Sequence, residues 1–281
     1  MKRNMIRHAL VGCLLLSSCC LFGNTVSAAS YQDSLTAKAT AQQLAQQETM
    51  GLLWMRTSAE YRGLCYQAYH AATVEIDAAL ADANRNKKPL AIILDCDETV
   101  VDNARNMGIS AAEGNGNYNG RWWRNSVHQG TSLAMPGAKE FLDATAQKGI
   151  EIFYVTNRYG PTNGEPTIKN LKELGFPSVN KEHILFFEKD SNKQPRFDQV
   201  TAKYDVILYL GDNAGDFPLD TQGKTLQERA DIFDQNKDNF GTKYIVLPNP
   251  AYGSWVSALD KNYQKMSPKE RDEINQKYLK Q

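Results

Sequence analysis

Two aspartates one residue apart follow an apolar run in the first half of the chain. Residues 90–94 are Leu-Ala-Ile-Ile-Leu, and Asp95 and Asp97 come directly after them. In an open α/β sheet, ligands bind outside the carboxyl ends of the strands, so these carboxylates are expected to face a crevice. A carboxylate can attack phosphorus when a divalent cation shields its charge. The pattern indicates phosphoryl transfer, although taken alone it is equally typical of an acidic turn.

A second apolar run ends in the same way, at Gly211, Asp212 and Asp216. Glycine allows the backbone to turn sharply or to approach a ligand closely. Carboxylate oxygens are the ligands that magnesium prefers, and without a cation so many carboxylates would repel one another and repel phosphate. We therefore expect one Mg²⁺ or another divalent cation at Asp95, Asp97, Asp212 and Asp216.

Polar side chains that could bind a phosphate group lie between the two acidic motifs. The apolar run over residues 151–155 ends in Thr156 and Asn157, whose hydroxyl and amide groups suit phosphate oxygens. Lys193 precedes the second acidic strand and could neutralise both the nucleophile and the transferring phosphoryl group. Lys189 remains an alternative for this role.

The two acidic motifs resemble the paired signatures of the haloacid-dehalogenase superfamily. Within it they resemble the class C acid phosphatases, which include bacterial lipoprotein 5′-nucleotidases; the matching segments are residues 95–99 and 211–217. The resemblance implies that Asp95 is the nucleophile and that Asp97 is the general acid and base, with its backbone carbonyl on the metal. It also implies that Thr156, Asn157 and Lys193 bind phosphate, and that Asp212 and Asp216 complete the metal site.

Asp97 distinguishes between the reactions of this superfamily. A phosphatase must protonate the leaving oxygen and then activate water, which requires a second carboxylate that the dehalogenases lack. Hydrolysis of phosphomonoesters is therefore expected, with an acidic pH optimum if Asp97 must begin the cycle protonated. A phosphotransferase that uses the same intermediate, and a ligand-binding or uptake lipoprotein on a phosphatase fold, remain alternatives.

Substrate selection is expected to depend on aromatic residues rather than on a cap domain. The intervals 97–156 and 158–193 are too short for a large cap, so the site should be open to several phosphomonoesters. Trp122 and Trp123 are expected to lie in a polar, glycine-rich segment that forms a loop over the crevice. The resemblance suggests Trp122 and Tyr252 as stacking walls for a nucleobase, although packing roles are equally typical of these residues. Nucleoside 5′-monophosphates are the favoured substrates.

The order of apolar and helical patterns predicts an α/β fold. Strands are expected near residues 90–95, 151–156, 183–187, 205–210 and 243–247, with helical patterns between them, as in a doubly wound, mostly parallel Rossmann-like sheet of the haloacid-dehalogenase type. Residues 33–281 should form a single domain with an N-terminal helical extension over 33–88. Ser267 is expected to cap a C-terminal helix. The two cysteines of this part, Cys65 and Cys96, are expected to be buried free thiols.

The N-terminal residues are typical of an exported bacterial protein. A basic start, an apolar run and the sequence Leu-Ser-Ser-Cys predict a signal peptide over residues 1–18, acylation of Cys19 and a tether over 19–32. An outer-membrane lipoprotein is favoured, and cleavage after Ala28 to release a soluble periplasmic protein is the alternative. Cleavage before Cys19 would leave 29 basic against 32 acidic side chains, which argues against nucleic acid as a partner. Exposed helices near the N-terminus would suit a homodimer.

Overall fold

The computed structural model describes residues 28–82, 88–115 and 120–280, and the chain divides into two compact units, residues 1–36 and 37–281. The predicted signal peptide and Cys19 lie outside the described residues. Helix α1 (Ala28–Thr57) begins inside the segment expected to be a tether, so residues 28–32 are helical instead. Residues 37–281 contain the sheet and both acidic motifs. No helix of the described residues combines the length and apolar character needed to span a membrane.

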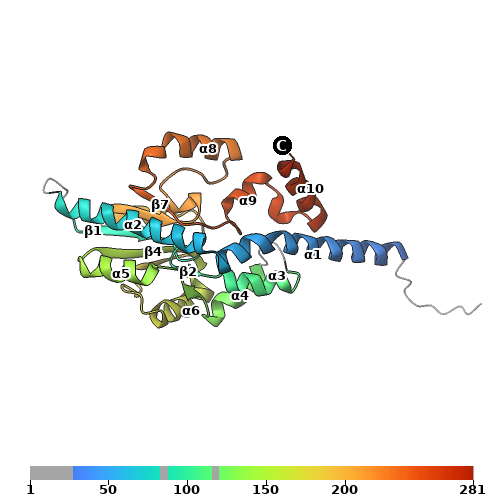
Figure 1. Cartoon of the computed structure of the whole chain (residues 1–281), viewed down its shortest axis with the longest axis horizontal. Coiled ribbons are helices and arrows are strands. Elements are labelled where there is room, and N and C mark those ends of the chain that lie inside the picture. Colours follow the sequence, from blue (N-terminus) through green and yellow to red (C-terminus); the bar gives the residue numbers. More distant parts are fainter. Residues whose placement is uncertain (1–27, 83–87, 116–119, 281) are drawn as a thin grey trace, which may run out of the picture. The chain divides into compact units, whose positions relative to one another are not determined.

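A parallel sheet forms the centre of this unit, as the sequence predicted (Figure 1). Its five strands stand in the order β5-β4-β1-β6-β7. Their bounds are β1 (Leu90–Leu94), β4 (Glu151–Tyr159), β5 (Ile184–Phe187), β6 (Asp205–Gly211) and β7 (Tyr244–Val246). Every neighbouring pair of these strands is parallel. Strand β1 lies in the middle of the sheet, which explains its uninterrupted apolar sequence, because helices cover both faces of such a strand.

Alternate side chains of β1 belong to two separate hydrophobic cores. Ile92 and Leu94 pack with helices α2 (Ala59–Ala81) and α5 (Ala138–Gln147) on one face, whereas Ala91 and Ile93 pack with α7 (Gln194–Thr201) on the other. This alternation follows from the two-residue period of a strand. Helix α6 (Gly160–Glu173) adds Leu171 to the first core. The doubly wound α/β architecture expected from the sequence is confirmed.

The connection from β1 to β4 holds small elements rather than a large cap. Besides α5, these are the antiparallel pair β2 (Val101–Asp102) and β3 (Leu133–Ala134), and the helices α3 (Ala104–Ala112) and α4 (Gly120–Gln129). Helix α4 carries both Trp122 and Trp123, so the expectation that they belong to a loop is wrong. Val127 on the same helix is buried, and burial of this face against the domain favours helix over loop.

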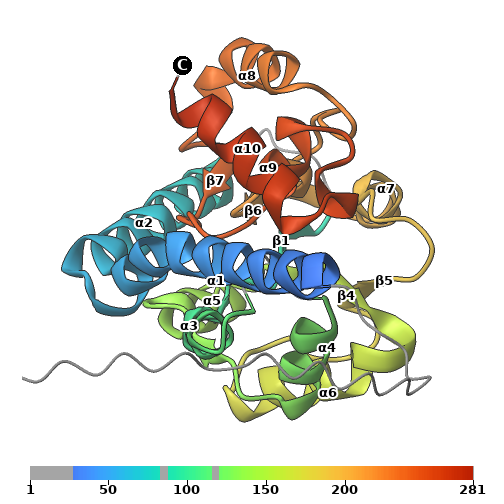
Figure 2. The same ribbon diagram turned by 90° about the vertical axis from the view of Figure 1, so that its right-hand side faces the viewer.

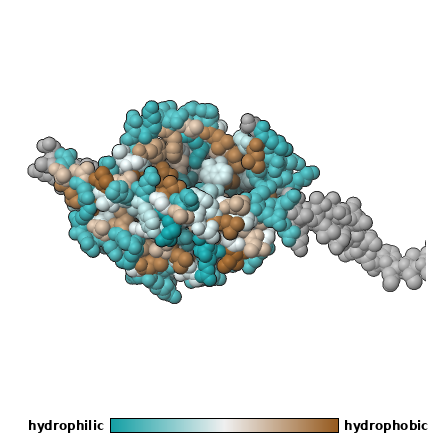
Figure 3. Space-filling model, viewed as in Figure 1, coloured by the Kyte–Doolittle hydropathy of each residue, from teal (hydrophilic) through white to brown (hydrophobic). Residues whose placement is uncertain are grey.

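The C-terminal helices and the helices α4 and α6 lie on opposite sides of the sheet (Figure 2). The C-terminal part contains α8 (Leu226–Gln235), α9 (Ser254–Leu259) and α10 (Pro268–Leu279), with short 3₁₀ turns η1 (Ala214–Asp216), η2 (Lys237–Asn239) and η3 (Tyr263–Lys265). Ser267 accepts the Glu270 N–H and caps α10, as predicted. The outer surface of α8 is hydrophilic (Figure 3).

Candidate active site

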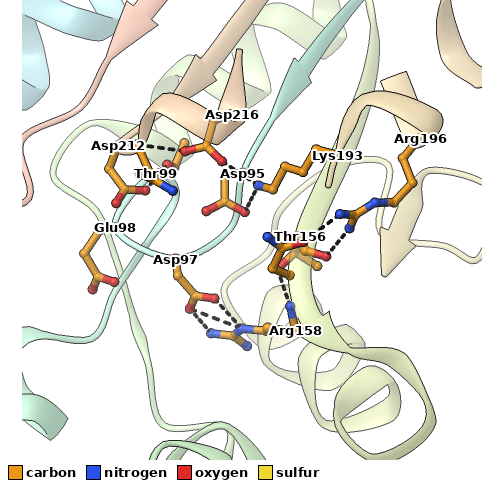
Figure 4. Close-up of polar contacts among 12 residues, drawn as sticks. Asp95, Asp97, Glu98, Thr99, Thr156, Arg158, Lys193, Arg196, Asp212 and Asp216 are labelled. Atoms are coloured by element: carbon orange, nitrogen blue, oxygen red, sulfur yellow. Dashed lines mark hydrogen bonds and ion pairs between the residues drawn. The ribbon is translucent and has the colours of Figure 1, made fainter. Parts of the chain in front are cut away.

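Lys193 joins the two acidic motifs. Its Nζ atom lies 2.7 Å from Asp95 Oδ1, at the end of β1, and 2.7 Å from Asp216 Oδ1, after β6 (Figure 4). Burial raises the pKa of Asp95 to about 7, although the Lys193 charge opposes that rise. Burial also opposes the charge of Lys193, but the two carboxylates outweigh it and raise the lysine pKa. Lys193 is therefore a permanent cation at the expected nucleophile.

Lys193 and Lys189 are both candidates for the phosphate-binding lysine, and they lie in different places. Lys189 is exposed and lines a surface cavity, together with Phe186 and Pro195, that includes none of the site carboxylates. Lys193 is only 4 % exposed. Of these two lysines, Lys193 is the one in contact with the expected nucleophile, and its predicted role with the phosphoryl group stays a prediction.

Three carboxylates converge beside this lysine. Oxygen atoms of Asp95, Asp212 and Asp216 lie within 4.8 Å of one another. Burial and the two neighbouring carboxylates raise the pKa of Asp212 well above its usual range. Two neutral donors orient the Asp212 carboxylate: Thr99 Oγ1 at 3.2 Å and Asn249 Nδ2 at 2.8 Å. Buried, oriented and mutually repelling oxygens fit a divalent cation, since its charge would offset the cost of ionising them.

Gly211 makes the close approach of Asp216 feasible. A Cβ atom at position 211 would lie 2.1 Å from Asp216 Cβ, which is a severe clash. Asp216 Oδ2 also accepts the Asn213 N–H at 2.8 Å within turn η1. The second motif therefore needs glycine at this position because a side chain would collide with Asp216, and not because the backbone adopts an unusual angle.

Asp97 faces away from this cluster and forms an ion pair with Arg158. The guanidinium contacts both carboxylate oxygens, and Asn103 Nδ2 donates a further hydrogen bond to Oδ1 at 2.9 Å. Arg158 is 2 % exposed and also donates to Thr167 Oγ1 at 3.2 Å. The Asp97 charge outweighs burial and raises the arginine pKa. The Asp97 carboxylate is not part of the three-carboxylate cluster, and the expected metal contact through its backbone stays a prediction.

Arg196 supports the part of β4 that carries Thr156 and Asn157. Its Nη1 donates to the Thr156 carbonyl at 2.7 Å, and its Nη2 donates to Asn157 Oδ1 at 2.6 Å. Asn157 in turn donates to the Ser191 carbonyl at 3.0 Å, in the loop that precedes Lys193. These contacts link Thr156, Asn157 and Lys193, the three expected phosphate ligands, into one polar group.

The expected aromatic walls are close together. Trp122, Trp123 and Tyr252 line one cavity of about 20 Å³, and the Trp123 and Tyr252 rings lie 6.2 Å apart. The Tyr252 hydroxyl donates to Glu98 Oε2. Burial and Asp97 raise the pKa of Glu98 to about 8, although hydrogen bonds from Tyr252 and Asn103 oppose the rise. A cavity of this size holds no nucleobase, so stacking on these rings would require them to separate.

Several residues of the site were not predicted from the sequence. Each of five such residues contacts a predicted one: Arg158, Arg196, Asn103, Asn249 and Glu98. A signal existed for Arg158 alone, because it lies two positions after Thr156 on the same strand and must share its face. The other four residues lie in loops or, for Arg196, on helix α7. At such positions the spacing in the sequence does not predict which way a side chain points.

Comparisons with known proteins agree with this arrangement. Residues 18–255 match the sequence model of a family described as HAD superfamily, subfamily IIIB (Acid phosphatase). The structure is similar to that of the class C acid phosphatase from Bacillus anthracis, with a TM-score of 0.79 and 37 % identity over 83 % of this chain and 97 % of that one. A structure of the class C acid phosphatase from B. anthracis with tungstate bound gives a TM-score of 0.78 and 36 % identity over 85 % and 97 %. The chain therefore belongs to the class C acid phosphatases of the haloacid-dehalogenase superfamily and is a phosphomonoesterase by family.

Proposed function

We propose that the protein is an exported, metal-dependent acid phosphatase that hydrolyses nucleoside 5′-monophosphates and other phosphomonoesters through an aspartyl-phosphate intermediate. The observation that carries the proposal is the contact of Lys193 with both Asp95 and Asp216, 2.7 Å each, beside the Asp212 carboxylate. A buried lysine in this position leaves one oxygen of Asp95 to attack phosphorus while the positive charge remains on the phosphoryl side.

The reaction proceeds in two displacements. Asp95 attacks phosphorus and the bond to the leaving oxygen breaks, while Asp97 donates the proton that this oxygen needs. Asp97 then takes a proton from the water that attacks the aspartyl-phosphate, which releases phosphate and restores Asp95. Thr156 and Lys193 stabilise the charge on the transferring oxygens. A divalent cation at Asp95, Asp212 and Asp216 would orient the phosphate and offset its charge.

Nucleotides are the favoured substrates because aromatic residues border the site. Trp122 and Tyr252 would hold the base by stacking once the rings have moved apart. An acidic optimum follows if Asp97 must enter the first displacement protonated.

The location in the cell envelope rests on residues 1–19. We propose a lipid anchor at Cys19 in the outer membrane; a soluble periplasmic form cut after Ala28 is the alternative. Metabolic labelling with a fatty acid distinguishes the two, because a lipid-anchored protein would carry the label and Cys19→Ala would abolish it, whereas a protein cut after Ala28 would carry no label with or without Cys19.

The activity is tested by phosphate release from nucleoside 5′-monophosphates, nicotinamide mononucleotide and sugar phosphates, with Mg²⁺ or with chelator. The wild type should release phosphate only with a divalent cation, and Asp95→Asn should release none. Asp231→Asn, an exposed residue of α8, is the matched control and should behave as wild type. Product analysis with added nucleoside would reveal a phosphotransferase. No release from any substrate with any divalent metal would refute catalysis and favour the uptake alternative.

A further inference from the structure

A cavity distinct from the one lined by Trp122 and Tyr252 adjoins the site. Its volume is about 690 Å³, within the range of small-molecule sites. Asn157 and Lys193, two of the expected phosphate ligands, are part of its lining. The rest of the wall comes from the connection between η1 and α8, from α8 itself and from α9. A molecule bound at Asp95 could therefore extend into this space.

The outer wall of this cavity is basic. Lys224, Arg229 and Lys261 line it, and Asp220 is the single carboxylate among its described lining residues. Lys224 Nζ lies 3.2 Å from Asp220, but the Asp220 side chain is 86 % exposed. Solvent screens such a surface pair, so it offsets little of the local positive charge.

Arg229 is the most informative of these cations. It is half-buried on α8, and its polar contact among the described residues is a long one, from Nη1 to the Thr221 carbonyl at 3.4 Å. Burial without a compensating carboxylate lowers its pKa. Neither Arg229 nor Lys261 forms an ion pair with any residue in the described part of the chain.

The positive charge of Lys224, Arg229 and Lys261 is separate from that of Lys193. Lys193 is already neutralised by Asp95 and Asp216, so it does not account for the basic character of the outer wall. A partly desolvated guanidinium with unfilled donors, in a cavity that two lysines also line, is suited to a dianionic phosphate group, which it can bind through charge-assisted hydrogen bonds.

We propose that this cavity binds a second phosphate group, carried by the same small molecule whose first phosphate is hydrolysed at Asp95. The preferred substrates would then be bisphosphorylated compounds. The cavity is far larger than one phosphate group, so it also leaves room for the part of the molecule that joins the two. This inference rests on the proposed phosphatase activity and adds a substrate class to it.

The test compares α,ω-alkanediol bisphosphates, with two to eight carbons between the phosphates, against the monophosphates of the same diols. For the best chain length, the KM of the bisphosphate should be about tenfold below that of the monophosphate, because one phosphate gains a half-buried arginine and a lysine. The difference should shrink as salt rises. The kcat values should differ little, since the second phosphate lies away from the reacting atoms.

Substitutions locate the effect. Arg229→Gln and Lys261→Gln should raise the KM for the bisphosphate towards that of the monophosphate and leave monophosphate kinetics unchanged, and Arg229→Lys should retain part of the preference. Lys237→Gln, an exposed cation of η2 outside the cavity, should change neither. Equal KM values for both series at every length, or an equal loss for both substrates in Arg229→Gln, would overturn the proposal.

A failure of the proposed activity would be recognised separately. If no monophosphate is hydrolysed, calorimetry of α,ω-alkane bisphosphonates binding to the full protein still tests the cavity. Binding that Arg229→Gln weakens about tenfold would support the second phosphate site without catalysis. Binding that is unchanged by the substitution, or absent, would refute it.

Discussion

Arg158 holds Asp97 in a two-pronged ion pair: Nε lies 3.1 and 3.0 Å from the two carboxylate oxygens, and Nη2 lies 2.6 Å from Oδ1. Both side chains are almost fully buried, and the Trp123 ring lies 6.0 Å from the guanidinium carbon. The expected general acid is thus directed by a residue two positions beyond the expected phosphate ligand Thr156. Its carboxylate is positioned before any substrate binds.

Substitution of Arg158 should affect catalysis and stability together. Removing one partner of a buried ion pair leaves a buried charge, so Arg158→Met should lower the free energy of unfolding by about 3 kcal/mol. It should also lower kcat by roughly tenfold to a hundredfold, because Asp97 loses its orientation. Urea unfolding and steady-state kinetics measure the two effects. Arg158→Lys should recover more stability than kcat; an unchanged kcat in both variants would contradict the positioning role.

Gly211 should tolerate no side chain. In Gly211→Ala the new methyl group would meet Asp216 Cβ at 2.1 Å, so either the turn or the carboxylate must move. We expect a loss of stability of about 1–3 kcal/mol, as for overpacked cores, and a loss of most phosphatase activity. Gly223→Ala, where nothing lies within 4 Å but φ is +70°, controls for backbone effects and should retain activity. Full activity of Gly211→Ala would show that the site does not need this close approach of Gly211 to Asp216.

Divalent cations should stabilise the fold. The cluster of Asp95, Asp212 and Asp216 repels itself, and a cation that binds only the folded state adds about 2.7 kcal/mol at a concentration of one hundred times its Kd. Thermal unfolding with Mg²⁺ should therefore give a higher Tm than unfolding with chelator. Asp212→Asn should reduce this difference and, by removing a buried charge, raise the Tm in chelator. A Tm that does not respond to any divalent cation would argue against a metal at these residues.

Variants of Tyr252 should show whether its ring stacks on a nucleobase or only packs around Glu98. Tyr252→Phe removes the hydrogen bond to Glu98 but keeps the ring, so nucleotide KM should change less than threefold if stacking is its role. Tyr252→Ala should raise KM for nucleoside 5′-monophosphates about tenfold and leave a small alkyl phosphate unaffected. Kinetics of both variants on both substrates provide the measurement. A loss of equal size for both substrates would assign Tyr252 to packing around Glu98.

Cys65 should resist thiol reagents in the folded protein. Burial raises the pKa of its thiol to about 12, chiefly through desolvation, so roughly one thiol in ten thousand is ionised at pH 8. Cys96 is also a buried free thiol. Alkylation followed by mass spectrometry should therefore modify residues 65 and 96 only after unfolding, at a rate that increases with denaturant. Rapid modification of Cys65 under native conditions would contradict its packing in the core.

Local patterns in the sequence were sufficient for the strands and for the two acidic motifs. The five strands of the sheet lie within two or three residues of their expected positions, because an apolar run buried on both faces is a local property of the chain. The position of Asp95 and Asp212 at strand ends follows from the same runs, and so does the cap of α10 at Ser267. The family could be identified from these motifs, since both are continuous in sequence.

The tertiary structure decided the relationships between distant segments. It selected Lys193 over Lys189, since the path of the loop after β5 determines which lysine reaches Asp95. It paired Arg158 with Asp97 across sixty-one residues, and it placed Trp122 on a helix because α4 packs one face on the domain. The basic cavity also depends on the tertiary structure. Arg229 lies on α8, Lys224 shortly before it and Lys261 just after α9, and the three line one cavity only in the folded domain. Side-chain direction and loop path depend on packing of the whole domain, and spacing along one chain does not determine them.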